Sequence, residues 1–518
     1  MNQVDSKTKL RTVWFDTARV AIEDIVDIAH RSSGAALSGA AEFRSAITGG
    51  ADFLNRLLDG DHRIYGVTTG FGDSCTVKIE PDLIAELPQH LYAYHGCGLG
   101  EYLTPVQTRA VIAVRLASLC KGYSGVSVSL LEQLVNLLRH DLLPVIPSEG
   151  SVGASGDLTP LSYLAAALCG EGEVWRDGMR VAAQQALADA GLTPLRLRPK
   201  EGLAIMNGTS VMTALACLTY ARAEYLARLA TRITALAVFA LDGNAYHFDA
   251  KLFSMKPHKG QQQVAAWLRR DLADNQPSQD GTRLQDRYSI RCAPHVIGVL
   301  ADALPWLREW IENELNSVND NPIIDAQDER VLYGGHFYGG HIAFAMDSMK
   351  NAVANLADLL DRQMALLVDS RYNNGLPANL SGVTGSRAAI NHGLKGLQIS
   401  ISAWTAEALK LTMPASVFSR STECHNQDKV SMGSIAARDC LRVLELTEQV
   451  VAGLLIAVRQ GVWLRRRLNA ADAPEANVKP MLDALGADIA VVEEDRKLEP
   501  ELRLLLERIR ECAWKLYE

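Results

Sequence analysis

The chain has 518 residues, 48% of them hydrophobic and 22% charged, and this ordinary globular composition excludes a disordered or fibrous protein. A formal net charge of −8 argues against a nucleic-acid-binding protein, because phosphate binding needs concentrated Lys and Arg. The nine scattered cysteines form no CxxC pair, which predicts reduced thiols in a cytoplasmic protein. The N-terminus lacks the apolar core of a secretion signal, and the longest apolar runs are too short to cross a bilayer.

Helical patterns dominate the predicted elements. The best strand candidate is 172–182, two short runs joined by Asp177-Gly178, a favoured hairpin turn. A helix is predicted within 304–322, ended by an Asn/Asp/Pro cluster that cannot continue it. Apolar residues at helical spacing, with few breakers, predict long helices over 211–242, 341–369 and 433–467. Helices this long usually pack side by side, so we predict a mainly α bundle.

Seven loops are rich in Gly, Asn and Tyr rather than merely polar. They are YGVTTGFGD (65–73), YAYHGCGLG (92–100), SVGASGDLTPLSY (151–163), MNGTS (206–210), QDRYSIRC (285–292), YGGHFYGGH (333–341) and ECHNQDKVSMG (423–433). Loops held by a rigid scaffold often carry catalytic groups, so these loops form the candidate site. Taken alone, Ala154-Ser155-Gly156-Asp157 is typical of an ordinary turn.

The standard catalytic motifs are missing. There is no HExxH, no His and Cys cluster at metal-ligand spacing, no GxGxxG after a strand and no P-loop, so we predict neither a metal nor a nucleotide cofactor. Ser155 does not lie in a GxSxG elbow, since Asp157 holds the fifth position. The remaining Tyr, Asn, Gln, Arg and Glu residues bind carboxylates and move protons, but they supply no strong electrophile.

The loop motifs, in their order, resemble those of the histidine, phenylalanine and tyrosine ammonia-lyase family, which includes aminomutases. The resemblance runs from YGVTTGFG to HNQDKVSMG, and EGLAIMNGTS, QDRYSIRC and NSVNDNP make it specific. It implies a long-helix bundle of the ammonia-lyase (fumarase/aspartase-like) type over 206–518, with a smaller loop-rich part at 1–205 that carries the prosthetic group. It also implies a homotetramer with shared active sites, a small-molecule substrate, and no nucleic-acid or membrane partner.

In that family, Ala-Ser-Gly cyclises to the electrophile 4-methylidene-imidazol-5-one (MIO). The resemblance implies that the nitrogen of Gly156 attacks the carbonyl of Ala154, with loss of water from the ring and from the Ser155 side chain. Gly156 lacks a Cβ and tolerates the compressed backbone. The substrate amine would add to the methylidene group. Tyr65 would then take the β-proton as a phenolate, which requires a lowered pKa.

The resemblance also assigns residues that bind the substrate. Arg291 would hold its carboxylate, because a guanidinium can bind a carboxylate through two parallel hydrogen bonds; the ordinary alternative is a surface ion pair. Lys395 and Glu423 would form an ion pair near the amine; the ordinary alternative is a surface salt bridge. The other family positions beside the ring or substrate are matched by Tyr94, His95, Asn207, Gln285, Tyr288, Phe337 and Gln427.

The residues leave the substrate open. Lys395 and Gln427 resemble the phenylalanine and tyrosine branch, because histidine lyases typically have Glu at the second position. Tyr94-His95 matches no branch, and His95 suits a polar ring. We predict elimination of ammonia from L-tyrosine, then L-phenylalanine, to give a trans-cinnamate-type acid. The alternatives are a histidine ammonia-lyase giving urocanate, an aromatic 2,3-aminomutase, and a non-catalytic assembly protein of the family shape.

Overall fold

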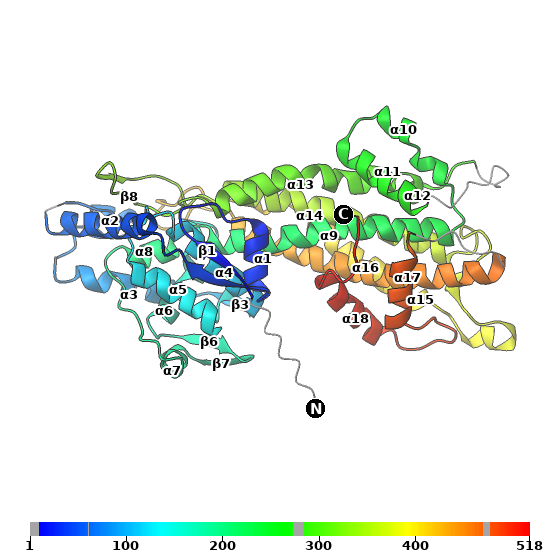
Figure 1. Ribbon diagram of the computed structural model, residues 1–518, viewed down its shortest axis with the longest axis horizontal. Helices are drawn as coiled ribbons and strands as arrows, with labels where there is room; N and C mark the ends of the chain where they lie inside the picture. Colours follow the sequence, from blue (N-terminus) through cyan, green and yellow to red (C-terminus); the bar gives the residue numbers. More distant parts are fainter. Residues whose placement is uncertain (1–9, 61, 273–283, 470–476, 518) are drawn as a thin grey trace. The chain divides into compact units, whose positions relative to one another are not determined.

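The structure, a computed structural model, describes residues 10–60, 62–272, 284–469 and 477–517. The chain forms two compact units, each assembled from three segments (Figure 1). The first comprises Met1–Ala221, Arg308–Asp347 and Pro414–Arg438, and the second comprises Arg222–Leu307, Ser348–Met413 and Asp439–Glu518. This grouping by packing differs from the predicted sequence boundary at 205/206, because four long helices contribute residues to both units.

These four helices carry the predicted long apolar patterns. They are α9 (Ser210–Ala240), α13 (Ala293–Leu315), α14 (Gly340–Val368) and α16 (Gly433–Asn469). The mainly α fold is therefore confirmed, and the bounds of α9, α14 and α16 agree with the predicted ranges within two residues. The predicted start of α13 was wrong, because buried apolar residues continue back from Pro305 to Ala293 and outweigh the helix-breaking tendency of that proline. Its end at Leu315, before NSVNDNP, is as predicted.

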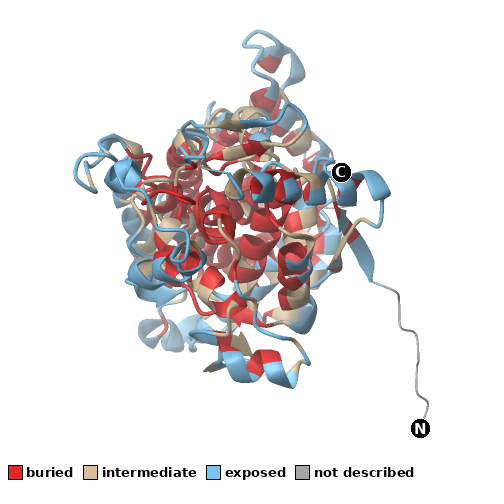
Figure 2. Cartoon of the chain, turned by 90° about the vertical axis from the view of Figure 1, so that its left-hand side faces the viewer, coloured by how far each residue is buried: buried red, intermediate tan, exposed pale blue. Residues whose placement is uncertain are grey.

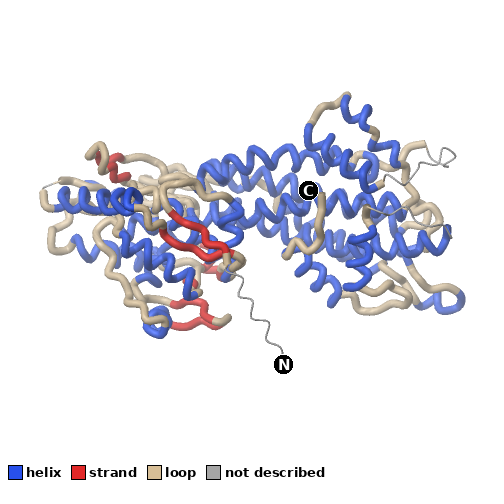
Figure 3. Tube along the Cα trace, in the orientation of Figure 1, coloured by secondary structure: helices blue, strands red, loops and turns tan. Residues whose placement is uncertain are grey.

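The strands of the described chain all lie in the first unit (Figure 3). They form a parallel pair, two antiparallel pairs and a three-stranded antiparallel sheet: β1 (Arg11–Phe15) with β2 (Ser33–Leu37), β3 (Leu99–Tyr102) with β5 (Pro147–Glu149), β8 (Ile323–Asp325) with β9 (Arg330–Leu332), and β4 (Leu143–Pro144), β6 (Glu173–Arg176) and β7 (Met179–Ala182). The predicted hairpin at 172–182 is confirmed, and Asp177 and Gly178 both have the positive φ that its tight turn favours.

Residues Thr108 to Leu119 of α4 (Pro105–Leu119) are all buried, and Figure 2 draws buried residues in red. Two shorter helices, α1 (Ile22–Ala29) and α5 (Val128–His140), pack against α4. A capping box starts α4: the Thr104 side chain accepts from the Gln107 amide, and the Gln107 side chain accepts from the Thr104 amide. The helices of this unit are α1 (Ile22–Ala29), α2 (Ala41–Leu58), α3 (Leu87–His95), α4 (Pro105–Leu119), α5 (Val128–His140), α6 (Leu158–Leu168), α7 (Ala183–Asp189) and α8 (Glu201–Met206), with 3-10 turns η1 (Gly72–Thr76), η2 (Ile84–Glu86) and η6 (Ala415–Val417).

The described part of the second unit consists of helices and loops (Figure 3). Besides its shares of the long helices, it contains α10 (Ala250–Ser254), α11 (Lys259–Asp271), α12 (Tyr288–Arg291), α15 (Lys395–Lys410), α17 (Lys479–Asp488) and α18 (Glu499–Arg510), with 3-10 turns η3 (Ala245–Phe248), η4 (Ala378–Leu380) and η5 (Gly385–Ile390). Among the described residues, no helix is both long and apolar enough to span a membrane.

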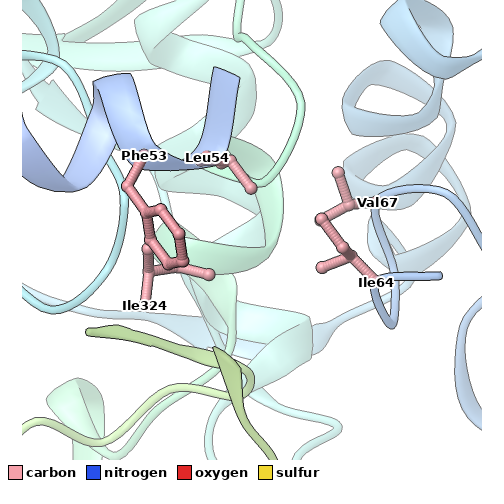
Figure 4. Packing of buried hydrophobic residues seen from close by; sticks show 5 residues of the cluster. All are labelled: Phe53, Leu54, Ile64, Val67 and Ile324. Atoms are coloured by element: carbon pink, nitrogen blue, oxygen red, sulfur yellow. The ribbon is translucent and has the colours of Figure 1, made fainter. Parts of the chain in front are cut away.

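A small apolar cluster anchors the loop that carries Tyr65. Ile64 and Val67, on either side of that tyrosine in the chain, are buried together with Phe53 and Leu54 of α2 and Ile324 of β8 (Figure 4). Burying side chains of this size contributes roughly 1.5–3 kcal/mol each. The loop is therefore fixed on both sides of Tyr65 by the core of the first unit.

Candidate active site

A cavity of about 260 Å³ in the first unit brings together loops that are distant in the sequence. Several of the glycine-rich loops form its wall. The predicted site residues that line it are Tyr65, Ala154, Ser155, Asn207, Phe337 and Gln427. The side-chain amide of Gln427 reaches to 3.5 Å from the Ser155 hydroxyl oxygen.

The Ala154-Ser155-Gly156 turn has a backbone that few residues adopt. Ser155 has a φ of 53° and Gly156 one of 77°, so two successive residues lie in the left-handed region. A Cβ on Gly156 would overlap the carbonyl group of Gly208. This close approach is reinforced by the Gly208 amide, which donates to the Ser155 carbonyl at 3.2 Å. A glycine is therefore required at 156 for both φ and space.

Asp157, the residue after the turn, anchors it through hydrogen bonds to α9 and α16. The sequence interpretation missed this role. Its carboxylate is fully buried and accepts from the backbone amides of Val211 and Met212 at 3.0 and 2.9 Å, and from the Ser434 hydroxyl. Burial raises the pKa of Asp157 to about 6, against the lowering effect of these donors. Asp157 therefore has a structural role beyond that of an ordinary loop residue, because its hydrogen bonds connect the turn to the start of α9.

Asn207 contacts the turn directly. Its side-chain amide donates to the Ser155 carbonyl at 3.0 Å, whereas its own buried Oδ1 has no hydrogen-bond partner in the described chain. Behind it, the buried guanidinium of Arg115 donates to Asn319 Oδ1 at 2.9 Å and to the Asn207 carbonyl at 3.4 Å. The sequence interpretation also missed Arg115. The only indication of its role in the sequence was that its partner, Asn319, belongs to the NSVNDNP motif.

Tyr65 lines the same cavity as the Ala154-Ser155-Gly156 turn, and its phenol is held by η1. The Gly72 amide donates to its phenol oxygen at 2.8 Å, and Glu423 accepts from the next amide, that of Asp73, at 2.9 Å. Burial raises the pKa of Tyr65; the Gly72 hydrogen bond opposes this, and the negative charge of Glu423 adds to it. These surroundings correct the expected direction, since a phenolate base was predicted to have a lowered pKa.

Tyr94 and His95 are the last two residues of α3, and they do not line the cavity. The centroids of their two rings lie 4.4 Å apart. Partial desolvation of the half-exposed phenol, with the charges of Tyr65 and Glu423, raises the pKa of Tyr94 to about 12. Burial lowers the pKa of His95 to about 4, so its imidazole is neutral at neutral pH. The charge of Tyr65 acts on Tyr94, so these two residues lie near each other. Tyr94 and His95 together offer a phenol and an imidazole as polar groups.

The other predicted residues, Gln285, Tyr288, Arg291 and Lys395, belong to the second unit. The structure brings two of them together, because the Arg291 guanidinium lies 4.7 Å from the centre of the Tyr288 ring. Tyr288 also lines a cavity of about 580 Å³ in this unit. Lys395 begins α15. Its predicted ion pair with Glu423 joins residues of different units and stays a prediction.

The described side chains include no group of three or more His, Cys, Asp or Glu that could hold a metal ion. The long-helix fold is that of the ammonia-lyases, a class of carbon–nitrogen lyases. The family model described as "Aromatic amino acid lyase" matches residues 20–485. The chain belongs to this family and is an ammonia-lyase, which confirms the resemblance seen in its loop motifs.

Three comparisons describe its similarity to known proteins. The histidine ammonia-lyase of Geobacillus kaustophilus is 42% identical over 404 residues, which cover 78% of this chain and 79% of that protein. The histidine ammonia-lyase of Gloeobacter violaceus is 37% identical and covers 96% of both chains. The crystal structure of tyrosine aminomutase from Streptomyces globisporus superposes with a TM-score of 0.89 at 32% identity, covering 97% of both chains.

Proposed function

We propose that this ammonia-lyase acts on L-histidine and gives urocanate. The observation that carries the proposal is the similarity of nearly the whole chain to curated relatives named histidine ammonia-lyase. This similarity favours the histidine alternative over the L-tyrosine that the sequence ranked first. The neutral ring of His95 supports the histidine alternative, because His95 adjoins Tyr94, which interacts electrostatically with Tyr65 of the cavity. A neutral imidazole has one donor and one acceptor to offer an imidazole substrate.

We also propose that Ala154, Ser155 and Gly156 form the MIO group. The residues present fit it: Gly156 has no Cβ, its amide lies in a turn held against Gly208, and the buried Oδ1 of Asn207 is unpaired within the described chain. The group would supply an electrophile for the substrate amine. Asp157 and Asn207 would hold the backbone of the turn in place through the hydrogen bonds described above.

The remaining roles follow from the side chains. Tyr65 would take the β-proton at its phenol oxygen, which the Gly72 amide stabilises as an anion. Arg291 would bind the substrate carboxylate, with Tyr288 and Gln285 beside it on the same segment. We propose a homotetramer in which these residues complete the cavity of a neighbouring subunit, as the family resemblance implies. A cytoplasmic location stays a prediction of the sequence.

L-Tyrosine is the second candidate substrate. Gln427 lies beside Ser155, at the position where histidine lyases typically carry Glu. Lys395 in the sequence also resembles the phenylalanine and tyrosine branch. The similarity to a tyrosine aminomutase of known structure points the same way. An aminomutase would return the ammonia to the β-carbon, and the outcome depends on how long the product stays enclosed.

Ultraviolet absorbance of the product, with ammonia measured in parallel, tests the proposal. Histidine should give urocanate and one ammonia for each product formed. Coumarate from tyrosine, with no reaction of histidine, would replace the first candidate by the second. A β-amino acid formed without free ammonia would identify an aminomutase. Intact mass tests the prosthetic group separately, because cyclisation removes two waters, about 36 Da, and an undiminished mass would overturn it.

A further inference from the structure

Asp286 is the centre of a hydrogen-bonded loop in the second unit. Its backbone carbonyl accepts from Nε of Arg291 at 2.9 Å. Its carboxylate accepts from the Asn244 amide at 2.7 Å, and its own amide donates to Nε2 of His247 at 2.9 Å. The turn that follows α9 therefore holds Asp286 through two contacts, one from the Asn244 amide and one to the His247 side chain, which has no assigned role.

His247 provides the acceptor for the Asp286 amide. Its side chain is only 14% exposed, and acceptance at Nε2 means that the neutral ring carries its proton on Nδ1. The Asp286 carboxylate lies 3.6 Å from the same nitrogen, and Arg291 is the other charge that acts on the ring. Burial, the largest effect, lowers the pKa of His247, so the imidazole remains an acceptor at neutral pH.

We infer that His247 is a positioning residue that orients Arg291 through the backbone of Asp286. The inference rests on the proposed binding of the substrate carboxylate by Arg291. A guanidinium binds a carboxylate through two parallel hydrogen bonds, so the plane of the group must be fixed. The bond from Nε to the Asp286 carbonyl and the nearby Tyr288 ring fix that plane. Among the described residues, no hydrogen bond engages the two terminal nitrogens, which we assign to the ligand.

Two substitutions separate the acceptor from the volume of the ring. His247→Phe keeps an aromatic ring without an acceptor, and His247→Gln keeps an acceptor. With the amino acid that the unsubstituted enzyme turns over, His247→Phe should raise KM about 5- to 10-fold, as expected for one lost hydrogen bond, with a smaller change in kcat. His247→Gln should stay nearer the unsubstituted value. His258→Phe, at an exposed position in the same unit, is the matched control and should leave KM unchanged.

A double-mutant cycle tests the coupling. In an Arg291→Lys background, His247→Phe should raise KM no further, since the group it orients is already altered. An equal rise in both backgrounds would overturn the inference, as would a His247→Gln enzyme as impaired as His247→Phe.

Hydrogen exchange of the peptide 284–292 gives a readout that does not depend on activity. The Asp286 amide should exchange faster in the intact His247→Phe enzyme than in His247→Gln or the unsubstituted enzyme. Unchanged exchange would overturn the inference. A wrong substrate proposal, by contrast, shows in the product of the unsubstituted enzyme and leaves this measurement intact.

Discussion

The backbones of Gly156 and Gly208 pair as a parallel bridge, close enough that a Cβ on the first would overlap the carbonyl of the second. Gly156→Ala should therefore displace the turn and block cyclisation, because the attacking nitrogen of residue 156 leaves its place beside Ala154. The mature protein should keep its full mass, instead of losing about 36 Da, and turnover should fall to background.

Gly172→Ala is a suitable control for this prediction. Gly172 also has a positive φ, 73°, but an added Cβ would meet nothing within 4 Å. It carries the strain of the left-handed backbone without the overlap, so this variant should lose the two waters normally. A Gly156→Ala protein with the reduced mass of the cyclised ring would contradict the role assigned to the close approach.

Long helices were the part of the fold that the sequence predicted well. Apolar residues repeat at helical spacing over about thirty positions in α9 and α14, and neither strands nor loops sustain such a repeat over that length. The strand β2, Ser-Gly-Ala-Ala-Leu, was missed because it contains neither β-branched nor aromatic residues. Its parallel pairing with β1 is a tertiary contact, which no local pattern encodes.

In the candidate site, too, the residues in sequence motifs were predicted, and those that depend on tertiary contacts were missed. Tyr65, Ser155 and Asn207 were predicted through motifs, and the structure gathers them at one cavity. Asp157 and Arg115 were missed because their importance arises from burial and from partners distant in the chain. Nor did the sequence predict that the surroundings of Tyr65 raise its pKa, since burial and the position of Glu423 depend on the fold.

Tyr65→Phe should separate formation of the ring from its use. The variant should lose the two waters, because the phenol oxygen accepts from the Gly72 amide and has no assigned part in cyclisation. Turnover should fall about 10²- to 10⁴-fold, as for loss of a general base. Since the pKa of Tyr65 is raised, kcat/KM should climb with pH into the alkaline range, and this limb should vanish in the variant.

Tyr333→Phe is the matched control for the phenol. Its hydroxyl donates to the carbonyl of Arg63 near the same loop, and its side chain is exposed. This variant should keep both turnover and the alkaline limb. Substantial turnover by the Tyr65→Phe enzyme would remove Tyr65 as the base.

His95 should make the stability of the protein depend on pH. Its pKa is about 4 in the folded chain, below the ordinary value of 6.5, so the unfolded chain binds a proton first as the pH falls. The free energy of unfolding should therefore decrease between pH 6.5 and 4. His95→Gln should reduce this decrease, measured by urea denaturation at pH 7 and 5. His90→Gln, exposed on the same helix, should leave it unchanged; equal slopes for all three proteins would refute the assignment.

Lys200 and Asp320 form an ion pair in the first unit with neither side chain exposed. Lys200→Met should reduce the free energy of unfolding by about 3–5 kcal/mol, because it leaves a buried carboxylate without its cation. Lys479→Met breaks an exposed pair with Asp483 and should cost less than about 1 kcal/mol. Chemical denaturation of the unsubstituted protein, the two single variants and the double variant Lys200→Met/Asp320→Leu at one pH measures the differences. If Lys200→Met and Lys479→Met lower the free energy of unfolding equally, other groups stabilise the buried Asp320 carboxylate and the prediction is wrong. If Lys200→Met/Asp320→Leu recovers most of the lost free energy, the destabilisation comes from the unpaired charge of Asp320.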